Sequence, residues 1–293
     1  MESARCRAFL AAAEGGSFTA AAEALHYTPS GVSQLVAALE RDLELKLLRR
    51  TQRGVTLTPA GETLLPAVRA FLNGEDRIRQ LAAEVNDLRI GSIRIATYPS
   101  MAMQYLPGVL REFSGAYPDI SIQVREGERR EIIAWLGAGE VDVGFIGGDD
   151  SLPGDWLPLA EDPMLALLPR SHPLAHARSY PLERCREERF IMGGRGWDED
   201  AIAMLHAHGI EPNVVLSTVS GISVLAMVES GLGISVMNEL VTRGHDCDIA
   251  LLPLDPPQHI TLGMLLPSLE NAAPAVRRFV QYAAKRLTRT ETN

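Results

Sequence analysis

Three polar side chains, Ser30, Ser33 and Gln34, fall within a stretch of five residues, a spacing that places them on one face of an α-helix. Hydroxyl and amide groups donate and accept hydrogen bonds, so they can meet the edges of neighbouring DNA bases. A helix with small polar residues near its amino end also fits the major groove, which is about 12 Å wide. The residues therefore predict a helix that reads base pairs.

The residues around this helix indicate how it is positioned. Thr28 can cap it with its hydroxyl, and Pro29 suits the first helical position, where its missing N–H would be unpaired in any case. The opposite face is apolar at helical spacing, through Val32, Leu35, Val36, Leu39 and Leu43. We therefore expect the apolar face to pack inward and the polar face to stay free.

A shorter helix is predicted at residues 17–25, and only His26 and Tyr27 separate it from Thr28. Two helices joined so closely form a helix-turn-helix. His26 falls where the turn needs a positive φ, which His tolerates better than most residues. Residues 48–57 are predicted to form a small hairpin, or wing, with Arg53 and Gly54 at its tip.

The wing carries positive charge although the chain is acidic overall. The formal net charge of −9 argues against binding to nucleic acid. Residues 45–60, however, contain four basic side chains and no acidic one, and phosphate contacts depend on the local cluster. Such a run is often only solvated surface. Beside a helix-turn-helix we expect it to contact DNA, through Arg49, Arg50 and Arg53.

Four segments, in this order and spacing, resemble the LysR-type transcriptional regulators: Gly16–Ala22, Pro29–Gln34, Leu39–Glu40 and Leu57–Glu62. By position on helix, cap and wing, we assign DNA contacts to Ser17, Thr28, Pro29, Ser30, Ser33, Gln34, Arg49, Arg50 and Arg53. Two positions depart from the family pattern, since Glu44 stands where the family has Gly and Leu48 where it has Phe. A glutamate in the left-handed conformation costs on the order of 1 kcal/mol.

A long helix is predicted from Thr58–Pro59 to about residue 88, with apolar residues at a spacing near 3.5. This stripe suits either a helix that pairs with another subunit or a single buried helix. The resemblance implies the first, because LysR-type subunits pair through this linker helix and generally form tetramers built as pairs of dimers. Asn73–Gly74 is the expected place for a bend.

From residue 89 onward, predicted strands alternate with predicted helices, which indicates an α/β fold with a largely parallel sheet. This part resembles the two-lobed, periplasmic-binding-protein-like (type 2) effector domain of the family. We expect an all-α winged helix-turn-helix domain in residues 1–58, the linker helix in 59–88 and the effector domain in 89–293. Lobe I would comprise about 89–165 and 267–293, and lobe II about 166–266.

Ligands of such folds bind where strands end and helices begin, because helix amino termini offer free N–H groups to an anion. The candidate effector contacts at such places are Tyr98, Ser100, Met101, Gly147, Gly193, Arg195, Val219 and Ser220. Ser100 and Ser220 are equally suited to capping helices, and Arg195 to pairing with a nearby acid. These residues favour a small anionic effector.

The chain shows no phosphate-binding loop, nucleophile elbow or metal-spaced histidine pair, so we expect no enzyme, metal site or cofactor. Cys6, Cys185 and Cys247 have no metal or redox spacing. Some family members sense oxidants through a cysteine pair, which keeps Cys185 with Cys247 as an alternative. Because no signal or membrane-spanning segment is evident, we expect a cytoplasmic protein with no membrane partner.

Together these features predict a ligand-responsive transcriptional regulator. An effector bound between the lobes would change the relative placement of lobes and subunits on double-stranded DNA. The resemblance implies that these subunits form a homodimer or homotetramer and bind an interrupted inverted repeat. RNA polymerase is a further partner that the resemblance allows. The alternative from another class is a small-molecule-binding α/β protein whose amino-terminal helices serve only for association.

Overall fold

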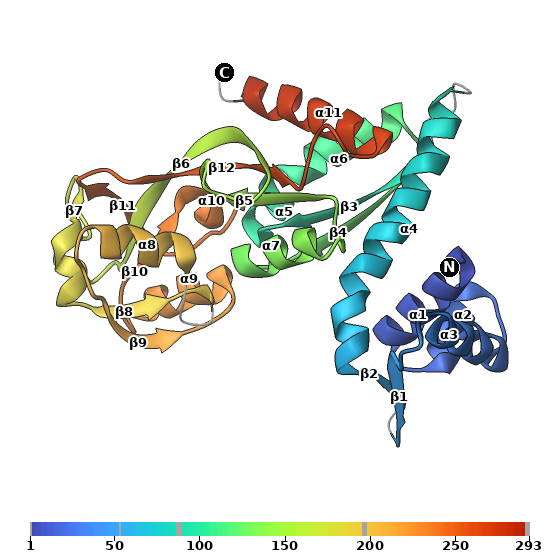
Figure 1. Ribbon diagram of the computed structural model, residues 1–293. Helices are drawn as coiled ribbons and strands as arrows, with labels where there is room; N and C mark the ends of the chain where they lie inside the picture. Colours follow the sequence, from blue (N-terminus) through green and yellow to red (C-terminus); the bar gives the residue numbers. More distant parts are fainter. Residues whose placement is uncertain (1, 53, 86–89, 195–197, 291–293) are drawn as a thin grey trace.

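The computed structural model describes residues 2–52, 54–85, 90–194 and 198–290. A helical amino-terminal domain with a protruding hairpin comes first, followed by one long helix and then a two-lobed α/β part (Figure 1). The long helix lies between the other two parts (Figure 1).

The amino-terminal domain contains α1 (Ser3–Gly15), α2 (Phe18–Leu25), α3 (Pro29–Leu43), β1 (Leu48–Thr51) and β2 (Gly54–Leu57). Its core packs Phe9 of α1 against Val32 and Leu39 of α3. His26 has φ 57° in the turn between α2 and α3, which confirms the predicted left-handed residue. The domain is therefore a winged helix-turn-helix, with α3 as its second helix.

The wing is tied to the rest of this domain at two points. The buried carboxylate of Glu40, on α3, accepts hydrogen bonds from the backbone N–H of Leu47 (2.9 Å) and Leu48 (3.1 Å). At the other end, the N–H of Val55 donates to the carbonyl of Gly16 at 2.8 Å. A Cβ at Gly54 would lie 2.2 Å from that same oxygen, so the close approach requires glycine. The wing thus has a fixed position beside α3.

Helix α4 (Pro59–Val85) continues without interruption through Asn73 and Gly74, where a bend was expected. Asn73 instead donates from its amide to the carbonyl of Gly139 in the α/β part, at 3.0 Å. Four large apolar side chains of α4 are exposed at intervals of seven, three and four residues: Phe71, Ile78, Leu81 and Val85, with Ile78 at 68% and Val85 at 85%. They form a surface stripe with the repeat of a pairing helix.

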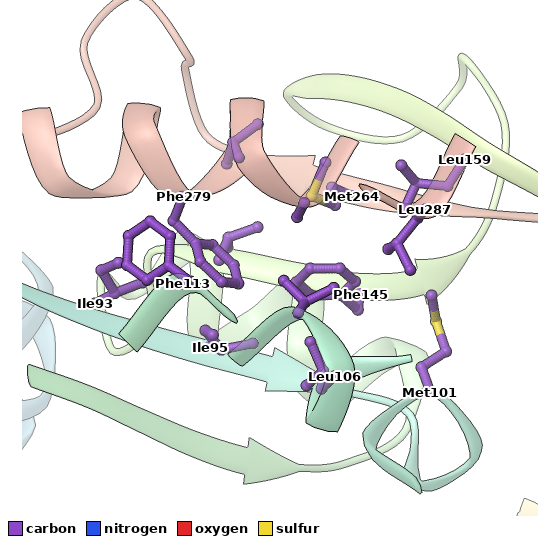
Figure 2. Close-up of a cluster of buried hydrophobic side chains, with 14 of the residues drawn as sticks. Ile93, Ile95, Met101, Leu106, Phe113, Phe145, Leu159, Met264, Phe279 and Leu287 are labelled. Carbon is purple, nitrogen blue, oxygen red and sulfur yellow. The ribbon is translucent and has the colours of Figure 1, made fainter. Parts of the chain in front are cut away.

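Lobe I is built on the parallel strands β3 (Gly91–Thr97), β4 (Ile120–Glu126) and β5 (Val143–Gly147), with β12 (His259–Leu266) antiparallel to β5. Helices α5 (Pro99–Gln104), α6 (Leu106–Ala116) and α11 (Pro274–Thr290) supply the side chains that pack on one face of this sheet. The rings of Phe113, Phe145 and Phe279 meet there (Figure 2), with centroids 5.2 and 6.2 Å from that of Phe279. Helix α7 (Arg129–Gly137) covers the other face.

Lobe II contains β7 (Tyr180–Pro181), a 3-10 helix (Leu182–Arg186), β8 (Arg189–Met192), α8 (Glu199–Ala207), β9 (Asn213–Ser217), α9 (Gly221–Glu229), β10 (Ser235–Asn238), α10 (Glu239–Thr242) and β11 (Ile249–Asp255). Strand β6 (Asp155–Pro169) runs through both lobes. Its first part pairs with β12, and residues 164–169 pair with β10 and β11.

This pairing places the lobe boundary differently from the sequence-based expectation. Within residues 259–266, expected in lobe II, Leu262–Leu265 pair with β5, and the side chains of Leu262, Met264 and Leu266 enter the lobe I core. Strand β11 was not predicted at all. Pro253 lies within its apolar run, and a proline weakens the sequence signal for a strand.

The conformation of Glu44 gives a stability prediction. Glu44 ends α3 in the left-handed region, with φ 54°, where an L side chain is strained. Replacing Glu44 by Gly is expected to raise the free energy of unfolding by about 1 kcal/mol in urea titrations. Glu44→Ala removes the same charge without relieving the backbone, so an equal gain in both variants would contradict the conformational explanation.

Candidate functional site

The outward face of α3 is free of the protein interior. Ser30 and Gln34 are exposed and Ser33 is half-buried, whereas Val32 and Val36 on the opposite face are buried. Thr28 caps the helix as predicted, because its hydroxyl accepts a hydrogen bond from the N–H of Gly31 at 3.1 Å, and Pro29 follows it, exposed, at the first helical position. The face can therefore meet a macromolecular surface.

One arginine of the wing, Arg50, lies beside this face. Arg50 donates to the hydroxyl of Ser33 at 2.9 Å, and its guanidinium lies 5.2 Å from the ring centroid of Phe18. Arg49 is exposed and donates to the hydroxyl of Thr56 at 2.9 Å. Arg53 lies outside the described residues. The structure thus brings a cation and the polar face of α3 together.

Ser17 has a structural function in the domain. Its side chain accepts a hydrogen bond from the N–H of Ala20 at 3.0 Å and caps α2. A helix cap at this position fixes the start of the helix that packs on α3.

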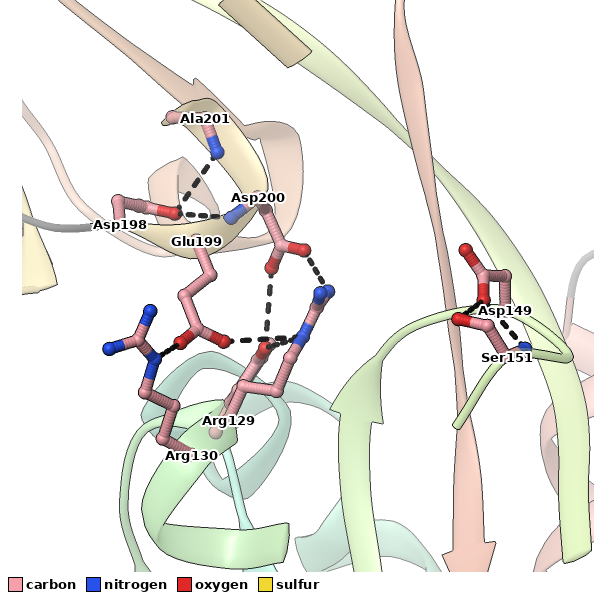
Figure 3. A network of polar contacts seen from close by, with 9 residues as sticks. Arg129, Arg130, Asp149, Ser151, Asp198, Glu199, Asp200 and Ala201 are labelled. Carbon is pink, nitrogen blue, oxygen red and sulfur yellow. Dashed lines mark hydrogen bonds and ion pairs between the residues drawn. The ribbon is translucent and has the colours of Figure 1, made fainter. Parts of the chain in front are cut away.

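The second candidate site lies between the two lobes, where the starts of α7 and α8 face each other (Figure 3). Arg129 of lobe I forms an ion pair with Asp200 of lobe II, and Arg130 forms one with Glu199. The hydroxyl of Tyr98 accepts a hydrogen bond from Arg129 and donates one to Asp200, both at 3.3 Å. These contacts hold the lobes together directly.

Gly147 allows this approach. A Cβ on Gly147 would lie 3.1 Å from a carboxylate oxygen of Asp200 and 3.3 Å from a guanidinium nitrogen of Arg129. A side chain there would press on both partners of the ion pair. The end of β5 is therefore shaped around the contact between the lobes.

Burial raises the pKa values of three side chains at this contact between the lobes. It raises the pKa of Asp200 to about 6, because loss of hydration outweighs the nearby charge of Arg129. Burial also raises the pKa of Asp198, whose carboxylate accepts from the backbone N–H of Asp200, and that of the Tyr98 hydroxyl. The ionised form of Asp200 is thus costly in the folded protein.

The helix starts at the cleft are already capped by acidic side chains. Asp198 accepts hydrogen bonds from the N–H groups of Asp200 and Ala201, at 3.1 and 3.2 Å. Glu128 and Glu131 form a reciprocal capping box at the start of α7. At the start of α8, Asp198 thus occupies N–H groups that we expected to be free for an anionic ligand.

The predicted effector residues have different positions. Tyr98 and Gly147 lie at the ion pair, and a Cβ on Gly193 would lie 3.4 Å from Asp198. Ser100 is buried, and Met101 is fully buried in the lobe I core, so Met101 acts in packing. Ser220 caps α9 by accepting from Ser223 at 3.4 Å, and Val219 is 61% exposed. Arg195 lies outside the described residues.

Sequence reasoning missed Arg129, Asp198 and Asp200. A signal was present, because the charged triplets at residues 128–130 and 198–200 open helices that follow strands, at the strand ends where ligands bind in such folds. What the sequence does not show is that the two triplets face each other.

The cysteines do not form a reactive pair. Cys6, Cys185 and Cys247 are all free thiols. Burial raises the pKa of Cys185 to about 12 and also raises that of Cys247. The two side chains pack in different apolar clusters of lobe II. Since the thiolate is the form that reacts with oxidants, neither thiol is activated.

Comparison with known proteins decides the family. Residues 4–62 match the model of the bacterial regulatory helix-turn-helix protein, lysR family, and residues 86–288 match the LysR substrate binding domain. The chain belongs to the LysR family of transcriptional regulators. It is 29% identical to the uncharacterized HTH-type transcriptional regulator YvbU of Bacillus subtilis over 94% of this chain and 96% of that protein.

Solved structures agree with this membership. A full-length variant of OxyR from Pseudomonas aeruginosa shares the fold with a TM-score of 0.78, at 21% identity over 98% of this chain and 94% of that one. The structure of full-length CbnR complexed with its target DNA matches with a TM-score of 0.66, at 25% identity over 98% and 99%. The LysR-family chain is thus a DNA-binding transcriptional regulator with an effector-binding domain, in a family of regulators rather than enzymes.

Two kinds of feature are absent from the described part of the chain. No helix there combines the length and the apolar character that crossing a membrane requires. No group of three or more His, Cys, Asp or Glu side chains there is arranged to hold a metal ion.

The raised pKa of Asp200 predicts a pH dependence of stability. Between about pH 4 and pH 6 the folded protein keeps a proton on Asp200 that the unfolded chain releases, so this contribution to stability is lost as the pH rises through about 6. Relative to wild type, Asp200→Asn should gain about 2 kcal/mol of unfolding free energy across this interval, measured by urea titration. The exposed Asp248→Asn is the control, and a pH-independent difference for Asp200→Asn would contradict the prediction.

Proposed function

We propose that α3 reads base edges in an interrupted inverted repeat upstream of the regulated genes, while arginines of the wing hold the phosphates. The observation that carries this proposal is the exposed face of Ser30 and Gln34 with Arg50 fixed beside it. Polar side chains on the helix suit base edges, and guanidinium groups suit phosphates. The similarity to CbnR, a protein whose structure was solved in complex with its target DNA, supports DNA binding by this chain.

A second subunit completes the site. The exposed apolar stripe of α4 pairs with its copy, and pairs of dimers form tetramers. Two copies of α3 then reach half-sites separated by a whole number of turns of the duplex, about 34 Å each.

A small-molecule effector binds in the cleft between the lobes, with a carboxylate of the ligand on Arg129. Because the ion pairs of Arg129 and Arg130 join the two lobes, a ligand that replaces them changes the spacing of the lobes. The changed spacing of the lobes alters the relative positions of the subunits on DNA.

Oxidant sensing through Cys185 and Cys247 is disfavoured by the raised pKa of both thiols, so DNA binding should not change after peroxide treatment.

Two variants separate base reading from phosphate binding. Gln34→Ala should weaken binding to the upstream intergenic duplex about tenfold and leave binding to a random duplex unchanged, because only a base contact is lost. Arg50→Ala should weaken binding to both duplexes. It should also reduce the slope of the logarithm of the binding constant against the logarithm of the salt concentration by about one, because one fewer counterion is released. Fluorescence anisotropy at several salt concentrations measures both effects, with Arg170→Ala in lobe II as control. Equal losses on both duplexes for Gln34→Ala would refute its assignment.

The pairing of α4 has its own test. Ile78→Glu places a charge in the apolar stripe and should convert the assembly to smaller species in light scattering coupled to size exclusion. Arg79→Ala, on the same helix but off the stripe, should keep the wild-type mass. An unchanged mass for Ile78→Glu would show that the subunits pair elsewhere.

A further inference from the structure

The charges at the interlobe ion pair restrict what the cleft can bind. Among the described residues there, Arg129 is the one half-buried cation, since the side chain of Arg130 is 74% exposed. Three carboxylates of lobe II lie near it: Asp200 and Glu199 form ion pairs with it, and Asp198 interacts with its charge (Figure 3). The starts of α7 and α8 are already capped by acidic side chains. A ligand carboxylate therefore has one favourable partner, Arg129.

Binding of a ligand carboxylate to Arg129 has a consequence for Asp200. If a ligand carboxylate takes the guanidinium of Arg129, Asp200 loses its cation while the negative charge of Asp198 still acts on it. An ionised carboxylate without a partner in a desolvated site is strongly unfavourable. A ligand that is only an anion must bear this penalty. A ligand that also brings a positive charge removes it.

We propose that the effector of this cleft is a small zwitterion, an α-amino acid, whose carboxylate binds Arg129 and whose ammonium group binds Asp200. This inference rests on the proposed effector function of the cleft and names the class of ligand. The carboxylate of the zwitterion takes the place of Asp200 beside Arg129, and its ammonium group takes the place of Arg129 beside Asp200. The two side chains are then separated by the length of the ligand. Tyr98, which now contacts both partners, can contact the ligand from lobe I.

The same exchange gives a mechanism of response. Arg129 and Asp200 are in direct contact, so the lobes meet without a spacer. With an amino acid between them, each charged group keeps an opposite charge while the lobes move apart by the size of the ligand. The ligand thus changes lobe spacing without leaving a charge unpaired, which a carboxylate alone or an amine alone cannot do.

The test uses the full-length protein at pH 7.5, where Asp200 is ionised, and follows its melting temperature. The probes are the proteinogenic L-amino acids at millimolar concentration, each with its deaminated acid and its decarboxylated amine. At least one amino acid should raise the melting temperature, and its two analogues should bind at least tenfold more weakly. No response to any amino acid, or equal binding of the plain acid, would overturn the proposal.

Variants then locate the ligand. Arg129→Gln should abolish the response, and Asp200→Asn should reduce the preference for the amino acid over its deaminated acid at least tenfold. Arg170→Gln, which removes an exposed cation that pairs with Asp248 within lobe II, should change affinity by no more than about twofold. A response to plain acids alone that depends on Arg129 would refute the zwitterion and retain the cleft as effector site. An amino-acid response that survives both Arg129→Gln and Asp200→Asn would refute the zwitterion proposal and also the assignment of the effector site to this cleft.

Discussion

The buried carboxylate of Glu40 is the contact on which the DNA-binding half of the protein depends. It accepts the N–H groups of Leu47 and Leu48 and the side chain of Lys46, so the chain leaving α3 is held against that helix as it enters the wing. Although burial raises the pKa of Glu40, these hydrogen bonds lower it more, and the carboxylate stays ionised. A buried N–H left without its acceptor costs about 1–3 kcal/mol. Recognition helix and wing therefore keep one relative geometry, which simultaneous contact with bases and phosphates requires.

A second buried ionic contact joins the DNA-binding domain to the effector domain. Arg69 of α4 donates to Glu14 of α1 at 2.9 Å and to Glu140 of lobe I at 2.7 Å. Arg94 holds the adjacent turn through Asp142 and the carbonyl of Gly139. These side chains line a cavity of about 390 Å³ between α1, α4 and lobe I. A displacement of lobe I must therefore move α1 or break the contacts of Arg69. These contacts can couple a change between the lobes to the position of the DNA-binding domain.

Local features of the chain could be predicted because short-range chemistry decides them. The cap at Thr28, the positive φ of His26 and of Glu44, and the free face of α3 all follow from neighbouring residues and helical spacing. Long-range features could not be predicted from the sequence. The pair of Arg129 with Asp200 joins residues whose helices meet only because β6 and β12 connect the lobes. The assignment of β12 to lobe I depends on its pairing with β5, which periodicity along one strand does not reveal.

Entry of α3 into the major groove is tested most directly by photo-cross-linking. Gln34 is replaced by p-benzoylphenylalanine, and the protein is irradiated on the upstream intergenic duplex. Asp42 lies on the same helix but contacts Arg5 of α1, so the same replacement at Asp42 is the matched control. Cross-links to bases of both half-sites are expected from position 34 and none from position 42. Cross-links from position 42 with none from position 34 would show that α3 does not face the DNA.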